Sequence, residues 1–286
     1  MTQPVKLDQA ALQSHSLPPV VDGDKETKGR ILVLAGSRDV PGAALLTATA
    51  AMRAGAGKLC IVTVASVAPQ LGVAMPEGMV VGLPEDGDGG FAAAAVKQIA
   101  RQAERVDAVV GGPGMASGDV CGQIADVLLQ TPARLALDAA LLHSLQPAPG
   151  ARTTVPVLLP HAGELASLLD CDEEEIEREP IRCGLRAANL YEAIVLVKGT
   201  VSHVVTPDDQ AWTYDGGAPG LGVSGSGDVL AGIVGGLLAR GAAPLNALLW
   251  SVWLHGEAGA RLADKVGPIG FLAREISDEV PALLRR

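Results

Sequence analysis

Residues 30–65 read RILVLAGSRDVPGAALLTATAAMRAGAGKLCIVTVA, and this stretch decides the fold. Its first part, residues 30–36, is an apolar run that ends in glycine, which is typical of a buried strand. A helix is expected next, because Pro41 and Gly55 stand where helices commonly begin and end. The apolar run at residues 58–65 predicts a second strand. This order predicts a right-handed crossover between two parallel strands.

The same alternation continues toward the C-terminus. Further apolar runs predict strands at residues 107–111, 135–138, 155–160 and 193–199, and the segments around them predict helices near residues 91–105, 119–129 and 173–191. Strands that alternate with helices of about ten to fifteen residues are typical of α/β proteins. We therefore expect a central, mostly parallel sheet with helices on both faces.

The last third of the chain has a different pattern. Residues 201–210, VSHVVTPDDQ, predict a β-hairpin, and residues 227–286 are expected to be mostly helical. No change in composition and no repeat of fixed period divides the chain. We therefore expect a polar, extended N-terminal segment at residues 1–28 and a single domain at residues 29–286.

Composition excludes several classes of protein. The chain has 286 residues, of which 48% are hydrophobic, and this excludes an intrinsically disordered chain. It carries 22 basic and 32 acidic residues, a formal net charge of −10. Nucleic acids and anionic membranes are bound by clustered Lys and Arg, so this acidity argues against both as partners. Two Phe, two Tyr and three Trp also offer few rings for stacking on bases.

Targeting and redox signals are weak. The first residues lack the apolar core of a signal peptide. The most apolar later stretch, Val229–Trp250, is interrupted by Arg240 and Pro244, which argues against a membrane span. The four cysteines form no CxxC pair, which argues against a zinc or redox site. A cytoplasmic protein is expected.

The most informative segment for function is residues 216–241, GGAPGLGVSGSGDVLAGIVGGLLARG. It holds ten of the 35 glycines, and SGSGD leads into an apolar helix. Unpaired N–H groups at such a helix N-terminus bind phosphate without help from Lys or Arg. Asp228 is either a proton acceptor beside the anion or a cap of the helix. The spacing fits neither a Walker A loop nor a strand-borne GxGxxG.

With its neighbouring motifs this segment resembles a known family. GSGDVLAG, together with AGSRDVPGAALLTATAAMRAGAG, GGPGM, LLPHAGE, VKG and WLHGEAGA, resembles the ADP- or ATP-dependent (S)-NAD(P)H-hydrate dehydratases of the ribokinase-like superfamily. The resemblance covers about residues 28–284. It implies a ribokinase-like fold and the repair of hydrated NADH or NADPH (NADHX, NADPHX). In this chemistry ADP or ATP phosphorylates the ring hydroxyl with Mg²⁺ present, and elimination then releases phosphate and restores NAD(P)H.

The resemblance also implies roles for individual residues. Asp228 matches the base, and it also matches a substrate-binding position. The other matches are Gly225, Ser226 and Gly227 in the anion hole, Lys198, Gly199, Thr200, Val201, Ser202 and Gly227 around the nucleotide, Ala43, Gly114 and His161 around the hydrated dinucleotide, and Glu164, through water, at magnesium. Each match has a structural alternative. Ala43 and Gly114 suit close packing, and Glu164 suits the first turn of a helix. Asp138 is expected to support the site, and His255 is set aside as a core or interface histidine.

Some positions depart from the family pattern, and alternatives for function stay open. Ala218 replaces the usual Asn before the anion hole, and Ser224 stands where the first glycine of a Gly-Gly pair is usual. Leu159, Ala162 and Ser202 are further departures. A kinase for a vitamin precursor or sugar, and a non-catalytic nucleotide-binding protein, are the two alternatives. The resemblance implies a homo-oligomer, a tetramer, with small-molecule partners and no nucleic acid or membrane.

Overall fold

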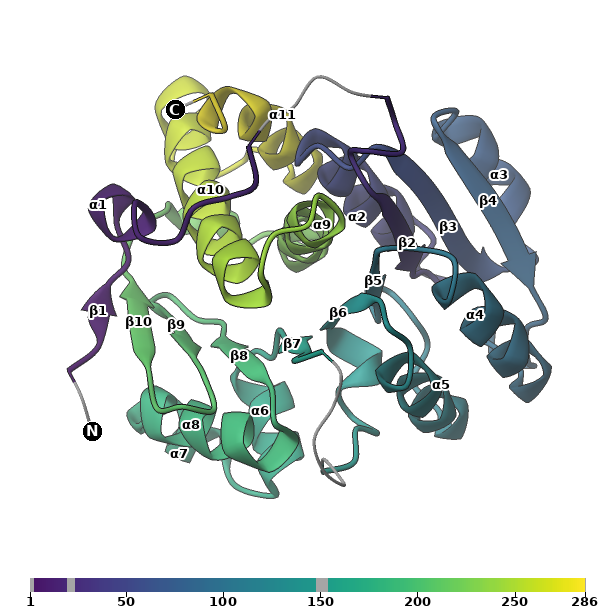
Figure 1. Ribbon diagram of the computed structural model, residues 1–286, viewed down its shortest axis with the longest axis horizontal. Helices are drawn as coiled ribbons and strands as arrows, with labels where there is room; N and C mark the ends of the chain where they lie inside the picture. Colours follow the sequence, from purple (N-terminus) through teal and green to yellow (C-terminus); the bar gives the residue numbers. More distant parts are fainter. Residues whose placement is uncertain (1–2, 20–23, 148–153, 286) are drawn as a thin grey trace.

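The structure is a computed structural model that describes residues 3–19, 24–147 and 154–285. Within these residues one sheet of ten strands crosses the molecule in the order β1-β10-β9-β8-β7-β6-β5-β2-β3-β4 (Figure 1). The strands are β1 (Val5–Lys6), β2 (Arg30–Leu34), β3 (Lys58–Val64), β4 (Gly78–Leu83), β5 (Ala108–Gly111), β6 (Arg134–Leu137), β7 (Val157–Leu158), β8 (Ile194–Val197), β9 (Ser202–Val205) and β10 (Ala211–Tyr214).

The sheet is mostly parallel, as the sequence predicts. Among the described strands only β9 runs against its neighbours, β8 and β10, and β9 with β10 forms the hairpin expected at residues 201–210. From β2 the chain moves to β3 and β4 on one side, and later continues from β5 on the other side. The order therefore reverses between β2 and β5. In open α/β sheets ligands bind beyond the carboxyl ends of the strands at such a switch point.

Helices cover both faces of this sheet (Figure 1). One face carries α2 (Gly42–Arg53), α3 (Ala68–Ala74), α9 (Ser226–Ala239), α10 (Pro244–Lys265) and α11 (Ala273–Leu283); the other carries α4 (Val96–Ala103), α5 (Asp119–Leu129), α6 (Ala162–Leu169), α7 (Glu173–Arg178) and α8 (Pro180–Tyr191). The short helix α1 (Gln9–Leu12) lies beside α10, and its Leu12 joins the core of the first face. Among the described helices, none is both long and apolar enough to cross a bilayer.

Two apolar cores, one on each face, explain the apolar runs of the strands. In β2, Ile31 and Val33 point into the core under α2 and α9, whereas Leu32 and Leu34 point into the core under α4 and α5. All four side chains are fully buried. Successive residues of a strand point to opposite faces, so a strand covered on both faces needs apolar residues throughout.

The glycines of α9 permit a close crossing of α9 and α2. A Cβ atom added to Gly232 would lie 2.2 Å from the carbonyl oxygen of Thr47, and one added to Gly236 would lie 2.4 Å from that of Ala51. These glycines are four residues apart and therefore share one helix face. Side chains there would separate the two helices that begin beside the candidate site.

The prediction of one continuous acidic helix at residues 173–191 is wrong. It is divided into α7 and α8 at Glu179, which has φ −136° and ψ 55°. Pro180 is the first residue of α8, and proline disfavours helical geometry in the residue that precedes it. The proline therefore ends one helix and begins the next.

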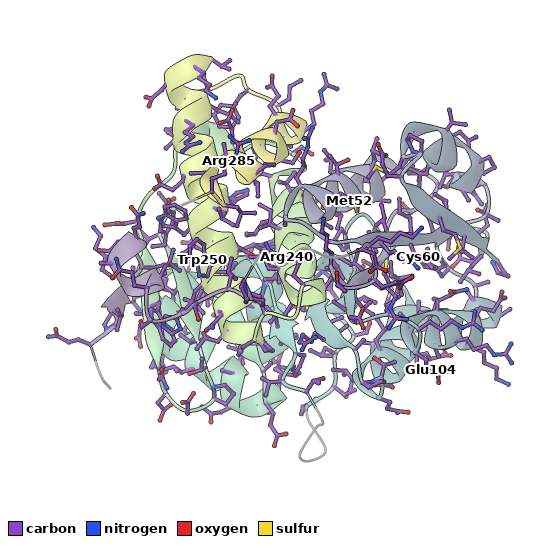
Figure 2. All side chains as sticks on the ribbon, turned by 45° about the horizontal axis from the view of Figure 1, so that its top comes forward. Met52, Cys60, Glu104, Arg240, Trp250 and Arg285 are labelled. Carbon is purple, nitrogen blue, oxygen red and sulfur yellow. The ribbon has the colours of Figure 1, made fainter. Side chains whose placement is uncertain are left out.

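The N-terminal segment is more ordered than an extended polar stretch. β1 pairs in parallel with β10, and Leu7 and Leu12 are buried. Trp250 of α10 donates its indole N–H to the carbonyl of His15 at 2.7 Å. Figure 2 labels Trp250 on α10, and Arg240 just beyond the end of α9. The segment is thus attached to the sheet and to α10. The helix α3 and the strand β4 were not predicted from the sequence; the β4 run, Gly78–Leu83, includes two glycines.

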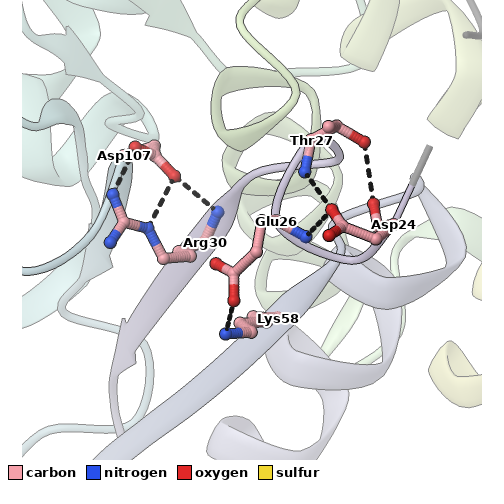
Figure 3. A network of polar contacts seen from close by, with 6 residues as sticks. All are labelled: Asp24, Glu26, Thr27, Arg30, Lys58 and Asp107. Carbon is pink, nitrogen blue, oxygen red and sulfur yellow. Dashed lines mark hydrogen bonds and ion pairs between the residues drawn. The ribbon is translucent and has the colours of Figure 1, made fainter.

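A polar network holds the loop that leads into β2 (Figure 3). The carboxylate of Asp24 accepts the backbone N–H groups of Glu26 at 2.9 Å and Thr27 at 3.2 Å. Glu26 forms an ion pair with Lys58 at the start of β3. Arg30 binds Asp107 through two side-chain hydrogen bonds of 3.1 Å. These contacts lie at the amino ends of β2, β3 and β5, opposite the candidate site.

Candidate active site

The glycine-rich segment forms the N-terminus of α9. Gly225 is the N-cap residue with φ +88°, a left-handed conformation that favours glycine. The N–H of Ser226 bonds to the carbonyl of Val223, but in the described part of the chain the N–H groups of Gly227 and Asp228 have no acceptor. Free N–H groups and the positive end of the helix dipole together make an anion-binding site.

Lys198 follows β8 and lies beside this turn. Its backbone N–H donates to the carbonyl of Pro160 at 2.9 Å, and a parallel β-bridge pairs Lys198 with His161. A Cβ atom added to Gly227 would lie 3.8 Å from Nζ of Lys198. The carboxyl ends of β7 and β8 therefore meet the start of α9.

Two buried carboxylates surround the Lys198 ammonium. Nζ lies 2.7 Å from Oδ1 of Asp138 and 3.9 Å from Oε2 of Glu164. Asp138 and Glu164 are only 3% and 6% exposed. Burial alone lowers the pKa of Lys198, but attraction to Asp138 and Glu164 and the hydrogen bond to Asp138 outweigh it, so the net shift is upward. Lys198 is therefore a fixed positive charge at the site.

Asp228 is poised to accept a proton. Burial, followed by repulsion from Asp138, raises the pKa of Asp228 to about 6, against the opposing effect of Lys198. Asp228 is the third residue of α9 and not its N-cap, which is Gly225, and no hydrogen bond from its side chain is found among the described residues. Asp228 therefore does not cap the helix, which was the alternative to its role as a proton acceptor. A carboxylate with a pKa just below neutrality is ionised at neutral pH and still basic enough for proton abstraction.

Glu164 has the helix-terminal role that the sequence left open. Its Oε2 accepts the backbone N–H of His161 at 2.8 Å, and its own N–H donates to Nδ1 of His161 at 3.3 Å. This reciprocal pair is a capping box at the start of α6. The role of Glu164 at magnesium stays a prediction.

A cavity of about 910 Å³ opens beside the α9 turn. It brings together seven of the predicted site residues: His161, Lys198, Gly199, Thr200, Ser202, Ser226 and Gly227. Val201 does not line the cavity, and its side chain is 41% exposed. Residues 214–219 of β10 and the following loop form another wall, which the sequence analysis did not assign to the nucleotide.

Ala43 and Gly114 lie together at the switch point between β2 and β5, outside the lining of the large cavity. Gly114 has φ +61°, and a Cβ added to it would lie 2.4 Å from Cβ of Ala43. The N–H of Gly36, after β2, donates to the carbonyl of Pro113 at 2.8 Å. The structure therefore supports the packing alternative for both residues, and their substrate role stays a prediction.

Gly225 connects these two regions. A Cβ on Gly225 would lie 2.5 Å from Cδ1 of Leu46 on α2, and 3.8 Å from Oδ2 of Asp228. The start of α9 thus stands between the large cavity on one side and the Ala43–Gly114 contact on the other. Asp228 does not line the large cavity; its carboxylate lies close to Gly225 at the start of α9.

His255 is the residue that sequence reasoning missed. It lines the cavity from α10, and its Nε2 lies 3.0 Å from Oγ of Ser226 and 3.1 Å from the carbonyl oxygen of Ser226. The available signal was its place within WLHGEAGA, one of the shared motifs. The pattern of an apolar helix does not show which of its residues faces a neighbouring helix N-terminus.

Comparison with known proteins identifies the family. The family model described as NAD(P)H-hydrate dehydratase matches residues 31–282. The chain belongs to this family. An ADP-dependent (S)-NAD(P)H-hydrate dehydratase of Xanthomonas campestris pv. campestris is 45% identical over 278 residues, which cover 97% of this chain and 95% of that one.

Solved structures of the dehydratase family and its superfamily agree with the fold. The Bacillus subtilis ADP/ATP-dependent NAD(P)H-hydrate dehydratase, co-crystallised with ATP/Mg²⁺, has a TM-score of 0.86 at 27% identity and covers 100% of this chain and 99% of that one. A ribokinase-like superfamily protein from Enterococcus faecalis has a TM-score of 0.83 at 22% identity, with 100% and 96% coverage. The ribokinase-like fold predicted from the sequence is confirmed.

The residues of this dehydratase-family site fit a magnesium ion that arrives with nucleotide phosphates. Asp138, Glu164 and Asp228 place three carboxylates around the single ammonium of Lys198, so negative charge is in excess. Among the described residues no three His, Cys, Asp or Glu side chains converge as a metal-binding group. Mg²⁺ is commonly held by one or two carboxylates together with substrate phosphates, which suits this arrangement.

Proposed function

We propose that this chain is an ADP-dependent (S)-NAD(P)H-hydrate dehydratase that restores NADH or NADPH and releases AMP and phosphate. The family and the relative that is 45% identical support this activity. The single observation that carries the chemistry is the Asp228 carboxylate, whose pKa is raised to about 6, beside the free N–H groups of the α9 turn. A base and an anion site lie next to each other there.

ADP binds in the large cavity with its terminal phosphate at the α9 turn. The N–H groups of Gly227 and Asp228 are free for the phosphate oxygens, and Lys198 adds a fixed positive charge. These donors are in place before the reaction, so they stabilise charge on the transferring phosphoryl group without reorganisation. Lys198, Gly199, Thr200 and Ser202 form the cavity wall for the nucleotide.

The hydrated nicotinamide ring reaches Asp228 from the side of Ala43 and Gly114. Asp228 takes the proton of the ring hydroxyl, whose oxygen then attacks the terminal phosphorus of ADP. The bond from that phosphorus to the AMP oxygen breaks. The resulting phosphate ester loses phosphate, together with a proton from the adjacent ring carbon, and the ring double bond is restored. The roles of Ala43, Gly114, His161 and Asp228 in this step are part of the proposal.

Mg²⁺ is the cofactor, and it would neutralise negative charge on the nucleotide phosphates. Asp138, Glu164 and Asp228 are the carboxylates near enough to Lys198 to face such an ion, directly or through water. ADP, or ATP in its place, is the phosphoryl donor. The cytoplasmic location, the tetrameric assembly and the domain boundary at residue 29 remain predictions.

A product analysis tests the proposal against its rivals. Incubation of hydrated NADH with the protein, ADP and Mg²⁺ is expected to give NADH, AMP and phosphate in equal amounts. A kinase of the same fold would instead leave a stable phosphate ester of another small molecule and no NADH. A protein that binds nucleotide without turnover would give neither product, and would pay the cost of a buried carboxylate without using it.

A further inference from the structure

His255 contacts the first residue of α9 twice through one nitrogen. Nε2 lies 3.1 Å from the carbonyl oxygen of Ser226 and 3.0 Å from its hydroxyl oxygen. A carbonyl oxygen only accepts hydrogen bonds, so Nε2 must carry the proton of a neutral ring for the first contact to form. The hydrogen bond to the Ser226 backbone is accordingly one that raises the pKa of His255, as a donated bond does.

The ring is neutral, which makes this tautomer consequential. Burial, with a smaller contribution from the nearby Lys198, lowers the pKa of His255 to about 4 against the opposing hydrogen bond to the Ser226 backbone. A neutral imidazole that is protonated at Nε2 cannot accept a hydrogen bond there. The Ser226 hydroxyl therefore accepts from His255, and its own hydrogen must point elsewhere.

The cavity is where that hydrogen can find an acceptor. Ser226 is 6% exposed and lines the cavity beside Gly227, at the N-terminus of α9. No other contact of the Ser226 hydroxyl is found among the described residues. A third donor would thus join the free N–H groups of Gly227 and Asp228 at the anion site.

We propose that His255 is a positioning residue for the dehydratase reaction: it donates from Nε2 to both oxygens of Ser226 and so directs the Ser226 hydroxyl hydrogen toward the transferring phosphoryl group. This inference rests on the proposed function. It also gives a role to the Ser226 hydroxyl, which lies at the N-terminus of α9. The Ser226 hydroxyl adds a side-chain donor to the backbone N–H donors of Gly227 and Asp228.

A double-mutant cycle tests the coupling of these two residues. Ser226→Ala and His255→Phe are each expected to lower kcat about 3- to 10-fold, the effect of one hydrogen bond. The double variant should lose no more than either single variant, because His255 acts only through the hydroxyl. His255→Gln, which keeps an N–H donor, should recover most of the loss. If the loss of kcat in the double variant equals the product of the losses in the two single variants, the residues act independently and the proposal is overturned.

A matched control separates this role from simple packing. Ser251 is buried on α10, one turn before His255, and its hydroxyl donates to the carbonyl of Ala247 at 2.7 Å within the helix. Ser251→Ala is expected to leave kcat unchanged. If it lowers kcat as much as Ser226→Ala does, the losses arise from repacking of α10 and the proposal fails.

A spectroscopic readout is independent of turnover and of any variant. Nitrogen NMR shifts of isotope-labelled histidine distinguish the two neutral tautomers. His255 is expected to carry its proton on Nε2 in the free protein, and a proton on Nδ1 would overturn the proposal. If the wild-type protein shows no dehydration, the proposed function fails. The coupling between Ser226 and His255 can then still be tested, because the same double-mutant cycle can be measured with the Kd for ADP in place of kcat.

Discussion

Nζ of Lys198 lies 2.7 Å from Oδ1 of Asp138, across the end of the strand that separates β6 from β8. Both side chains are largely buried, and Glu164 is a second acidic neighbour at 3.9 Å. This pair joins the carboxyl ends of the strands to the α9 turn, because Lys198 also lies beside Gly227. The same pair sets the electrostatics of Asp228: Asp138 raises its pKa, and Lys198 lowers it.

Removal of the Lys198 ammonium should destabilise the fold. Lys198→Met leaves Asp138 and Glu164 buried without their partner, and breaking a buried pair in this way costs about 3–5 kcal/mol. Thermal unfolding should therefore occur at a clearly lower Tm. Lys58→Met is the matched control, because its ion pair with Glu26 is exposed and worth about 0–1 kcal/mol. Equal Tm changes in the two variants would contradict a structural role for Lys198.

Activity should depend on the ionisation of Asp228. Its pKa of about 6 predicts that kcat/KM falls as pH drops through 6, because the protonated carboxyl cannot accept the substrate proton. Asp138→Asn removes a repulsive charge, so the acid limb of the profile should move to lower pH. Asp107→Asn, at the amino ends of the strands and away from the site, should leave the acid limb of the profile in place. An unmoved limb in Asp138→Asn would show that another group titrates.

Asp228→Asn should lose activity and gain stability. Loss of a general base costs about 100- to 10,000-fold in kcat, while ADP binding should survive. The pKa of Asp228 is raised on folding, so the ionised carboxylate costs stability above its folded pKa of about 6, and the cost vanishes below the unfolded value of 3.8. With allowance for partial exposure, the gain at pH 8 is about 1–2 kcal/mol. Thermal unfolding at pH 8 and pH 4 checks this; a Tm gain that is equal at both values would exclude the ionisation as its cause.

The sequence predicted the sheet well because its central strands are buried on both faces. Runs such as residues 31–35 are apolar throughout for that reason, and the glycine-rich turn marked the start of α9. The strand at Gly78–Leu83 was missed because it lies at the edge of the sheet, where the residues are half exposed and the apolar run is weak.

The side-chain contacts of the site could not be predicted in the same way. Lys198 and Asp138 are 60 residues apart, and they meet only because β6 and β8 flank the short β7. His255 faces Ser226 only because α10 crosses the start of α9. Motifs placed the residues at strand ends and helix starts, whereas distances between them depend on how whole helices pack.

Gly114→Ala should interfere with the hydrated substrate and not with the nucleotide. The added Cβ would meet Ala43 at 2.4 Å, and a left-handed φ of +61° costs about 1–2 kcal/mol for alanine. We expect a higher KM for the hydrate and an unchanged Kd for ADP. Gly118→Ala is the matched control on the same loop, because its φ of 171° is extended and its added Cβ meets nothing within 4 Å. If the Kd for ADP rose as much as the KM for the hydrate in Gly114→Ala, the contact between Gly114 and Ala43 would not be specific to the hydrated substrate, contrary to this prediction.

In the proposed reaction, Asp228 and the α9 turn dehydrate the nicotinamide ring while ADP is split into AMP and phosphate. The most direct measurement is the return of the near-ultraviolet absorbance of dihydronicotinamide when the purified protein is mixed with hydrated NADH, ADP and Mg²⁺. We expect that absorbance to recover, with one AMP and one phosphate released for each NADH formed, and almost no recovery with Asp228→Asn. No recovery by the wild-type protein with either ADP or ATP would contradict the proposed reaction.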